Sequence, residues 1–308
     1  MNDTRKHILT TLAYFDIFHY PLQGEEIHRF HGQPASREET DEELRLLTEE
    51  HTICFIDGFY LLNNNSGLVT KRKEANSLAT RQMVIACKSA RLLSRFPYVK
   101  GVAISGSLSK NYADEKADID FFIITTANRL WIARTLMHLF KKLTYLAGRQ
   151  NRYCMNYYVD EAALVIEEKN IFTAIEISTL IPMHGKRSLD DFVIANSWVN
   201  QYFPYCRMDT GNTPGIRKGF LSAMIERLFH AGLGNRLDKW LMAITERRWK
   251  RKESKNLKNS KGNPLGMIVS RHCSKPNPKN FQDKVIDKFR HKIEALLLPM
   301  KEMSRADP

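Results

Sequence analysis

The feature that most constrains this chain is the segment 101–125, in which two apolar runs flank a polar connection. The first run is Val-Ala-Ile at 102–104, and the second is Phe-Phe-Ile-Ile at 121–124. An unbroken apolar run of this kind is typical of a strand buried on both faces. The segment therefore predicts two strands of a core sheet joined by a polar turn.

Two carboxylates stand at the start of the second run. Asp118 and Asp120 are two residues apart, and side chains at this spacing on a strand project from the same face, with Cα atoms about 6–7 Å apart. Paired carboxylates at the mouth of a buried strand can hold a hard cation together with substrate phosphates. Asp118 and Asp120 are therefore the candidate metal ligands.

The polar connection begins with Gly106 and Ser107. Glycine lets the backbone approach a ligand closely and adopt unusual dihedral angles. Ser107 can cap a following helix, and free N–H groups at a helix start attract phosphate. Lys110 lies three residues beyond Ser107 and could neutralise phosphate charge, although a solvated loop lysine fits the pattern equally well.

Together these motifs resemble the DNA polymerase beta-like nucleotidyltransferase superfamily over about residues 97 to 126. The resemblance implies an α+β fold with a mixed sheet flanked by helices. It implies that Gly106 and Ser107 contact the phosphates of a nucleoside triphosphate such as ATP, while Asp118 and Asp120 hold Mg²⁺ or Mn²⁺. The implied reaction moves a nucleoside monophosphate onto an acceptor hydroxyl.

A third carboxylate is expected by resemblance on the next strand, predicted at 152–159. That strand carries Asn156 in its interior, and an amide is a poor metal ligand and no base near neutral pH. Asp160 has the parity of Asn156 along a strand and is the candidate third catalytic residue. Glu161 and Glu176 are neighbouring candidates, and a solvated turn is the other interpretation of Asp160 and Glu161.

Residues 1–66 are predicted to form a winged-helix-like domain of three helices and a hairpin. Ser36 and Glu39 form a capping box at the third helix, and Asp57-Gly58 suits a type I′ hairpin turn. The third helix is rich in glutamate, which repels phosphate. A packing or protein-contact role is therefore favoured over DNA recognition.

The rest of the chain divides into a nucleotidyltransferase-fold domain at 67–205 and a helical region at 206–308. Asn128 is the expected N-cap of one helix. A basic run occupies 247–261 and could bind nucleic acid or steer an anionic substrate, or form a solvated face. The further predicted helices are 68–96, 128–148, 167–182, 190–203, 221–249 with a break at 232–234, and 281–298.

The composition is compatible with several partners. The 308 residues carry a formal net charge of +13, which permits an anionic partner without choosing one. Five scattered cysteines without a Cys-x-x-Cys motif indicate reduced thiols, and no apolar run approaches a membrane span. We expect a cytoplasmic protein with no membrane partner, whose acceptor is a small molecule or a protein.

Three functional hypotheses follow from the sequence. The first is a metal-dependent nucleotidyltransferase with an unknown acceptor. The second is a catalytically weak or inactive nucleotide-binding regulatory protein, which Asn156 supports. The third, less favoured, is a nucleic-acid-binding winged-helix regulator that uses the N-terminal domain and the basic run.

Overall fold

The computed structural model describes residues 3–115, 117–146, 148–230, 232–257, 266–276 and 281–306, with 276 and 298–306 described by backbone alone. Residues 258–265 of the basic run and its continuation lie outside this part of the chain.

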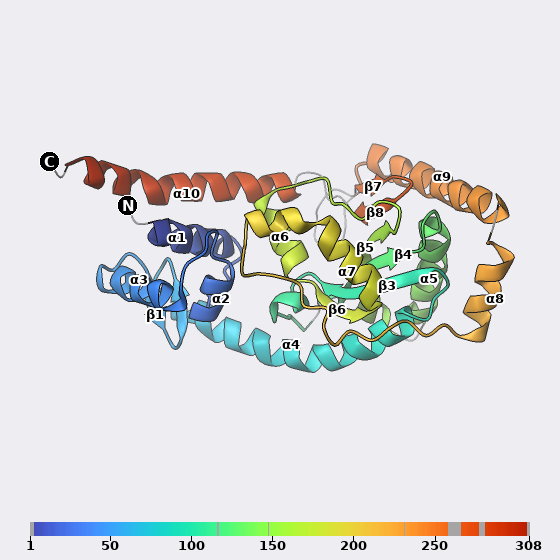
Figure 1. The fold of residues 1–308 in the computed structure, drawn as a ribbon, viewed down its shortest axis with the longest axis horizontal. Helices are drawn as coiled ribbons and strands as arrows, with labels where there is room; N and C mark the ends of the chain where they lie inside the picture. Colours follow the sequence, from blue (N-terminus) through green and yellow to red (C-terminus); the bar gives the residue numbers. More distant parts are fainter. Residues whose placement is uncertain are drawn as a thin grey trace.

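One mixed sheet of six strands lies at the centre of the molecule (Figure 1). Its order is β6-β3-β4-β5-β8-β7, in which β4 and β5 are parallel and all other neighbours are antiparallel. The predicted strands around the Gly-Ser turn are confirmed as β3 and β4. The strands are β3 (Val99–Ser105), β4 (Asp120–Thr125), β5 (Cys154–Asp160), β6 (Ile181–His184), β7 (Met267–Val269) and β8 (Cys273–Pro276).

Helices cover both faces of the sheet and extend beyond its ends (Figure 1). The α-helices are α1 (Asp3–Asp16), α2 (Gly24–Arg29), α3 (Arg37–Glu49), α4 (Ser66–Leu93), α5 (Leu130–Tyr145), α6 (Ile171–Ser178), α7 (Lys186–Ala195), α8 (Phe220–Leu228), α9 (Gly232–Ser254) and α10 (Phe281–Ala306). The short 3₁₀ helices are η1 (Leu108–Lys110), η2 (Gln150–Arg152) and η3 (Ser197–Gln201).

Alternation along β4 divides its apolar run between two cores. Phe121 and Ile123 pack into the cluster formed with α4 and α5, whereas Phe122 and Ile124 pack into the cluster that includes α6 and α7. All four side chains are buried. The prediction of a strand buried on both faces is therefore confirmed, and burial of this apolar area stabilises the centre of the fold.

The N-terminal region follows its local sequence signals. The capping box at α3 forms as predicted, with the Ser36 hydroxyl accepting from the Glu39 N–H and the Glu39 carboxylate accepting from the Ser36 N–H. β1 (Cys54–Ile56) and β2 (Phe59–Leu61) make a hairpin whose turn residues, Asp57 and Gly58, both have positive φ. A type I′ turn requires this conformation at both positions.

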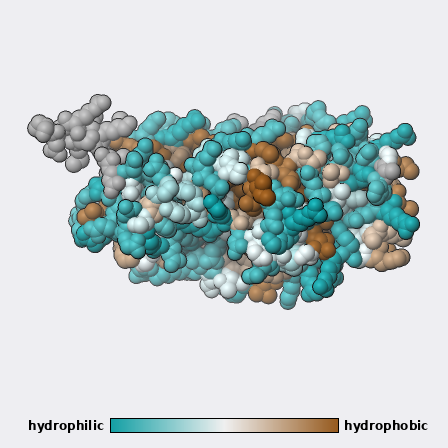
Figure 2. Space-filling view, viewed as in Figure 1, coloured by the Kyte–Doolittle hydropathy of each residue, from teal (hydrophilic) through white to brown (hydrophobic). Residues whose placement is uncertain are grey.

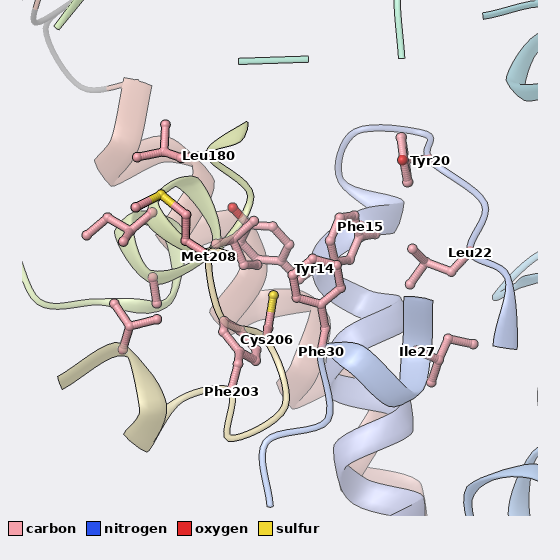
Figure 3. Close-up of a cluster of buried hydrophobic side chains, with 14 of the residues drawn as sticks. Tyr14, Phe15, Tyr20, Leu22, Ile27, Phe30, Leu180, Phe203, Cys206 and Met208 are labelled. Carbon is pink, nitrogen blue, oxygen red and sulfur yellow. The ribbon is translucent and has the colours of Figure 1, made fainter. Parts of the chain in front are cut away.

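The helices of the N-terminal region share a buried cluster with the sheet-bearing part of the chain. Figure 3 shows Tyr14, Phe15 and Phe30 on one side of this cluster and Phe203 and Met208 on the other. The rings of Phe30 and Phe203 meet edge to face with centroids 5.5 Å apart. Such contacts fix the orientation of the N-terminal helices on the sheet.

The C-terminal third differs from the predicted helical region. It contributes β7 and β8 to the central sheet, and α10 packs against α1 and α6. The predicted helix 221–249 is divided in two, but the interruption falls before the predicted 232–234, because α8 ends at Leu228 and residues 232–234 form the first turn of α9. Both strands are short, with three residues in β7 and four in β8, and nothing in their local sequence signals that β8 pairs with β5.

Two other local predictions were wrong. The predicted helix 167–182 ends earlier, and its last residues form β6, which pairs antiparallel with β3. Asn128 is not the N-cap of α5, because it has a left-handed φ of 60° and Arg129 is the capping residue. None of the helices in the described part of the chain combines the length and the apolar character that crossing a membrane requires.

Candidate functional site

The predicted motifs meet at one end of the central sheet. β3 ends there at Ser105, which is paired with Asp120 at the start of β4. The parallel partner strand β5 begins at the same end, with Cys154 opposite Asp120. Strand pairing therefore brings together the Gly-Ser turn, Asp120 and the start of β5, and Asp118 lies two residues before β4.

Gly106 turns the chain out of the sheet directly beside Asp120. It has a φ of +69°, and a methyl group added there would lie 2.5 Å from Oδ2 of Asp120. The N–H groups of Gly106 and Ser107 donate no hydrogen bond within the described residues, and the exposed Ser107 side chain makes no capping bond. Free N–H groups in such a turn form an anion-binding concavity.

The two predicted metal ligands differ in their surroundings. Asp118 precedes β4, is exposed, and forms no hydrogen bond or ion pair within the described residues. Asp120 is half-buried, and its Oδ1 accepts a hydrogen bond from Nδ2 of Asn156 at 2.5 Å. Asn156 therefore holds the Asp120 carboxylate in place.

Cys154 extends this contact, and sequence reasoning gave it no role. Its thiol donates to Oδ1 of Asn156 at 3.2 Å, which orients the amide with its NH₂ group toward Asp120. Burial, with the negative charge of Asp120 nearby, raises the pKa of Cys154 to about 12. The thiol is therefore protonated at neutral pH and able to donate. The sequence signal for this contact was that Cys154 and Asn156 are two residues apart on one strand.

Lys110 is engaged within the protein. Its ammonium donates to Oε1 of Glu176 at 2.8 Å and to the carbonyl oxygen of Gly106 at 3.2 Å. The Tyr20 hydroxyl of the N-terminal region donates to the Lys110 carbonyl oxygen. Lys110 thus ties the Gly-Ser turn to α6, and Glu176 lies beside the turn as its ion-pair partner.

The structure does not bring Asp160 to this site. Asp160 is paired with Thr125 at the far end of β4, five residues beyond Asp120, and five residues of strand span about 17 Å. Its side chain is fully buried and accepts from the N–H of Asn128, the N–H of Ala162 and Nδ1 of His272. Glu161 accepts from the Ser188 hydroxyl at the same far end.

A bulge explains why the parity argument for Asp160 failed. The register of β5 against β4 shifts between Phe121 and Phe122, whose partners are Met155 and Tyr157. Asn156 is the extra residue of the bulge. Each later side chain of β5 therefore points to the face opposite to the one that counting by two from Asn156 predicts. Asn156 therefore faces Asp120, while Tyr158 packs into the core on the other face of the sheet.

The side chains and turn N–H groups at this end of the sheet are compatible with Mg²⁺ bound together with a phosphate group. No group of three or more His, Cys, Asp and Glu side chains is arranged to hold a metal among the described residues. Mg²⁺ is commonly bound by one or two carboxylates, with substrate phosphates and water completing its octahedral shell. Asp118 and Asp120 would supply those carboxylates, and the N–H groups of the turn would donate to the phosphates beside them.

No family model matches this chain, and neither the curated proteins nor the solved structures contain a match to it.

Proposed function

We propose that this chain binds a nucleoside triphosphate with Mg²⁺ at the Asp120 end of the sheet and transfers the nucleoside monophosphate to an acceptor hydroxyl. The observation that carries the proposal is the close approach of Gly106 to Asp120, which places beside a carboxylate turn N–H groups that donate no hydrogen bond to any described residue. A nucleotidyltransferase-like sheet with a winged-helix-like N-terminal domain is the fold that goes with this function. The free state of all five cysteines supports a cytoplasmic location.

Each residue of the site has a defined task in this proposal. Gly106 and Ser107 donate to the phosphates, and Asp118 and Asp120 would hold Mg²⁺. When bound, the metal supplies the positive charge that offsets the triphosphate and the attacking oxygen. Asn156 keeps Asp120 in one rotamer, and Lys110 supports the turn through Glu176. Phosphoryl chemistry of this kind depends on such positioning.

The second candidate is a nucleotide-binding protein with little or no turnover. The observation that favours it is the amide of Asn156, which occupies the place next to Asp120 where a carboxylate would serve as base. The carboxylate that ends β5, Asp160, is buried at the other end of the sheet. Nucleotide binding is common to both candidates, and turnover separates them.

Pyrophosphate release from labelled nucleoside triphosphates with Mg²⁺ distinguishes the candidates. Asn156→Asp adds a carboxylate beside Asp120, and we expect it to raise the rate about 100-fold, the usual scale of a general base. Asn156→Ala is the control, because it removes the bond to Asp120 without adding a base, and we expect no gain.

Measurable release by the unaltered protein supports transfer. Nucleotide binding without release, in both the unaltered protein and Asn156→Asp, contradicts transfer and leaves the binding role.

A further inference from the structure

We propose that α8 and α9 form a surface that docks on an anionic membrane. This proposal is independent of the nucleotide site, because it rests on none of the residues that form that site. Figure 2 shows hydrophobic atoms among the hydrophilic ones at the end where Figure 1 places these two helices.

Large apolar side chains project into solvent from both helices. Phe220 is 82% exposed, Leu221 69% and Trp240 60%. These three large side chains therefore contribute little to the core of the protein. The exposed apolar residues of the two helices are Phe220, Leu221, Met224, Leu228, Leu233, Trp240 and Ile244. An apolar surface of this size on a helix pair indicates an interaction site.

These helices are firmly held on the protein, so their exposed faces are not a result of loose packing. Ile225 of α8 and Leu237 of α9 pack into a cluster with Tyr98 and Ile132. The Arg129 guanidinium donates to the carbonyl oxygens of Phe229 and His230 at 3.1 and 2.5 Å. These contacts attach both helices to the sheet-bearing part of the chain.

The apolar stripe of α9 continues into a cationic one. Leu233, Trp240 and Ile244 are spaced by seven and four residues and share one side of the helix, and Arg251 follows on that side seven residues later. A cleft of about 500 Å³ lies there, lined by Ile244, Arg247, Arg248, Arg251, Lys252, Lys255 and Leu257. The side of α9 thus presents an apolar half and a basic half.

None of the five cations that line the cleft forms an ion pair within the described residues. The acidic helix α3 differs, because Arg37 is bonded to Asp41 and Arg45 to Glu42 and Glu49. Unpaired cations beside apolar side chains match the headgroups and acyl chains of an anionic leaflet. A second copy of this chain, with a net charge of +13, would be repelled by the same cations.

A membrane accounts for both halves of the surface, and nucleic acid accounts only for the cations. Phosphate backbones bind lysine and arginine but leave Phe220, Leu221 and Leu228 exposed to water. Helices that lie in the interface bury their apolar face about 5–10 Å deep without crossing the bilayer. The expectation of no membrane partner rested on the lack of a spanning segment, which a surface-bound helix pair does not need.

Vesicle cosedimentation of the full chain tests the proposal, using phosphatidylcholine with and without phosphatidylglycerol. We expect binding only to the anionic vesicles. The triple variant Arg247→Glu, Arg251→Glu, Lys255→Glu should weaken it more than tenfold, because each cation near an anionic leaflet contributes about fivefold. Its matched control is Lys71→Glu, Arg81→Glu, Lys88→Glu on α4, which makes the same change of net charge at exposed positions elsewhere.

The apolar half is tested by Phe220→Ser with Leu221→Ser, against Phe55→Ser with Ile194→Ser as exposed apolar controls. Brominated lipid should quench tryptophan fluorescence, and Trp240→Phe should remove most of that quenching. The proposal is overturned if either control variant loses as much vesicle binding as the test variant that it matches. It is also overturned if the unaltered chain does not bind vesicles at low salt. Salt-dependent binding of single-stranded DNA without vesicle binding also overturns it, in favour of a nucleic-acid site.

Discussion

Two aspartates at opposite ends of the parallel strand pair have opposite environments. Asp160 is fully buried and accepts from two backbone N–H groups and from His272. Asp120 is half-buried and lies against a glycine turn whose N–H groups donate no hydrogen bond within the described part of the chain, and the exposed Asp118 precedes it by two residues. The difference teaches that a strand-end carboxylate is a candidate ligand only where the surrounding chain leaves it accessible instead of enclosing it with hydrogen-bond donors.

The largest effect is expected at the Asp120 end from Gly106→Ala. The change forces a side chain into a positive-φ position and places a methyl group 2.5 Å from Oδ2 of Asp120. We expect unfolding free energy to fall by about 3 kcal/mol and nucleotide binding to be lost. Chemical denaturation and calorimetry measure the two effects.

Gly58→Ala is the matched control for this change, because Gly58 has a φ of +88° and open space around its Cα. Gly58→Ala should lower the unfolding free energy by about 1–2 kcal/mol, because alanine disfavours this backbone conformation. Nucleotide binding should remain intact. Equal nucleotide affinities in the two variants would contradict the assignment of the Gly106 turn.

A smaller effect is expected at the other end from Asp160→Asn. The amide keeps one acceptor oxygen but directs an NH₂ group at the donors that surround it. We expect a loss of about 2 kcal/mol in unfolding free energy, the scale of hydrogen bonds to a buried charge. Nucleotide affinity of the folded variant should not change, and a tenfold loss would show that Asp160 acts on the site despite its distance.

The smallest effect concerns Asp238, a third aspartate, which accepts from the N–H of Ile132 at the start of α5. Burial raises the pKa of Asp238 from 3.8 to about 6. Because its pKa is raised in the folded protein, Asp238 favours folding when it is protonated. This contribution to the unfolding free energy is fully present below pH 3.8 and is lost as the pH rises through about 6.

The unfolding free energy of Asp238→Asn should therefore rise relative to that of the unaltered protein as the pH rises through this range. Urea denaturation at several pH values measures this difference. A constant difference between the two proteins across the range would contradict the assignment.

Local signals in the sequence predicted the local structure well. The Ser36–Glu39 capping box and the Asp57-Gly58 turn depend on residues within four positions of each other, and both form as expected. The pairing of β3 with β4 followed from two apolar runs with a short connection. The same signals placed Gly106, Asp118 and Asp120 at one end of the sheet.

Features that depend on distant partners could not be predicted in this way. β8 is held by β5, which lies more than a hundred residues earlier, and β6 looks helical until β3 is placed beside it. The bulge at Asn156 reverses the face of every later residue of β5, so counting by two from Asn156 to Asp160 gave the wrong face. Asp160 also accepts a hydrogen bond from His272, which no local pattern connects with β5.

Calorimetric titration of ATP, with and without Mg²⁺, tests the central claim most directly. The account predicts Mg²⁺-dependent binding by the unaltered protein and by Asp114→Asn with Glu115→Gln, two exposed acids of the same connection. It predicts no Mg²⁺-dependent binding by Asp118→Asn with Asp120→Asn. Unchanged Mg²⁺-dependent affinity in that double variant would show that the aspartates at the start of β4 are not the metal ligands.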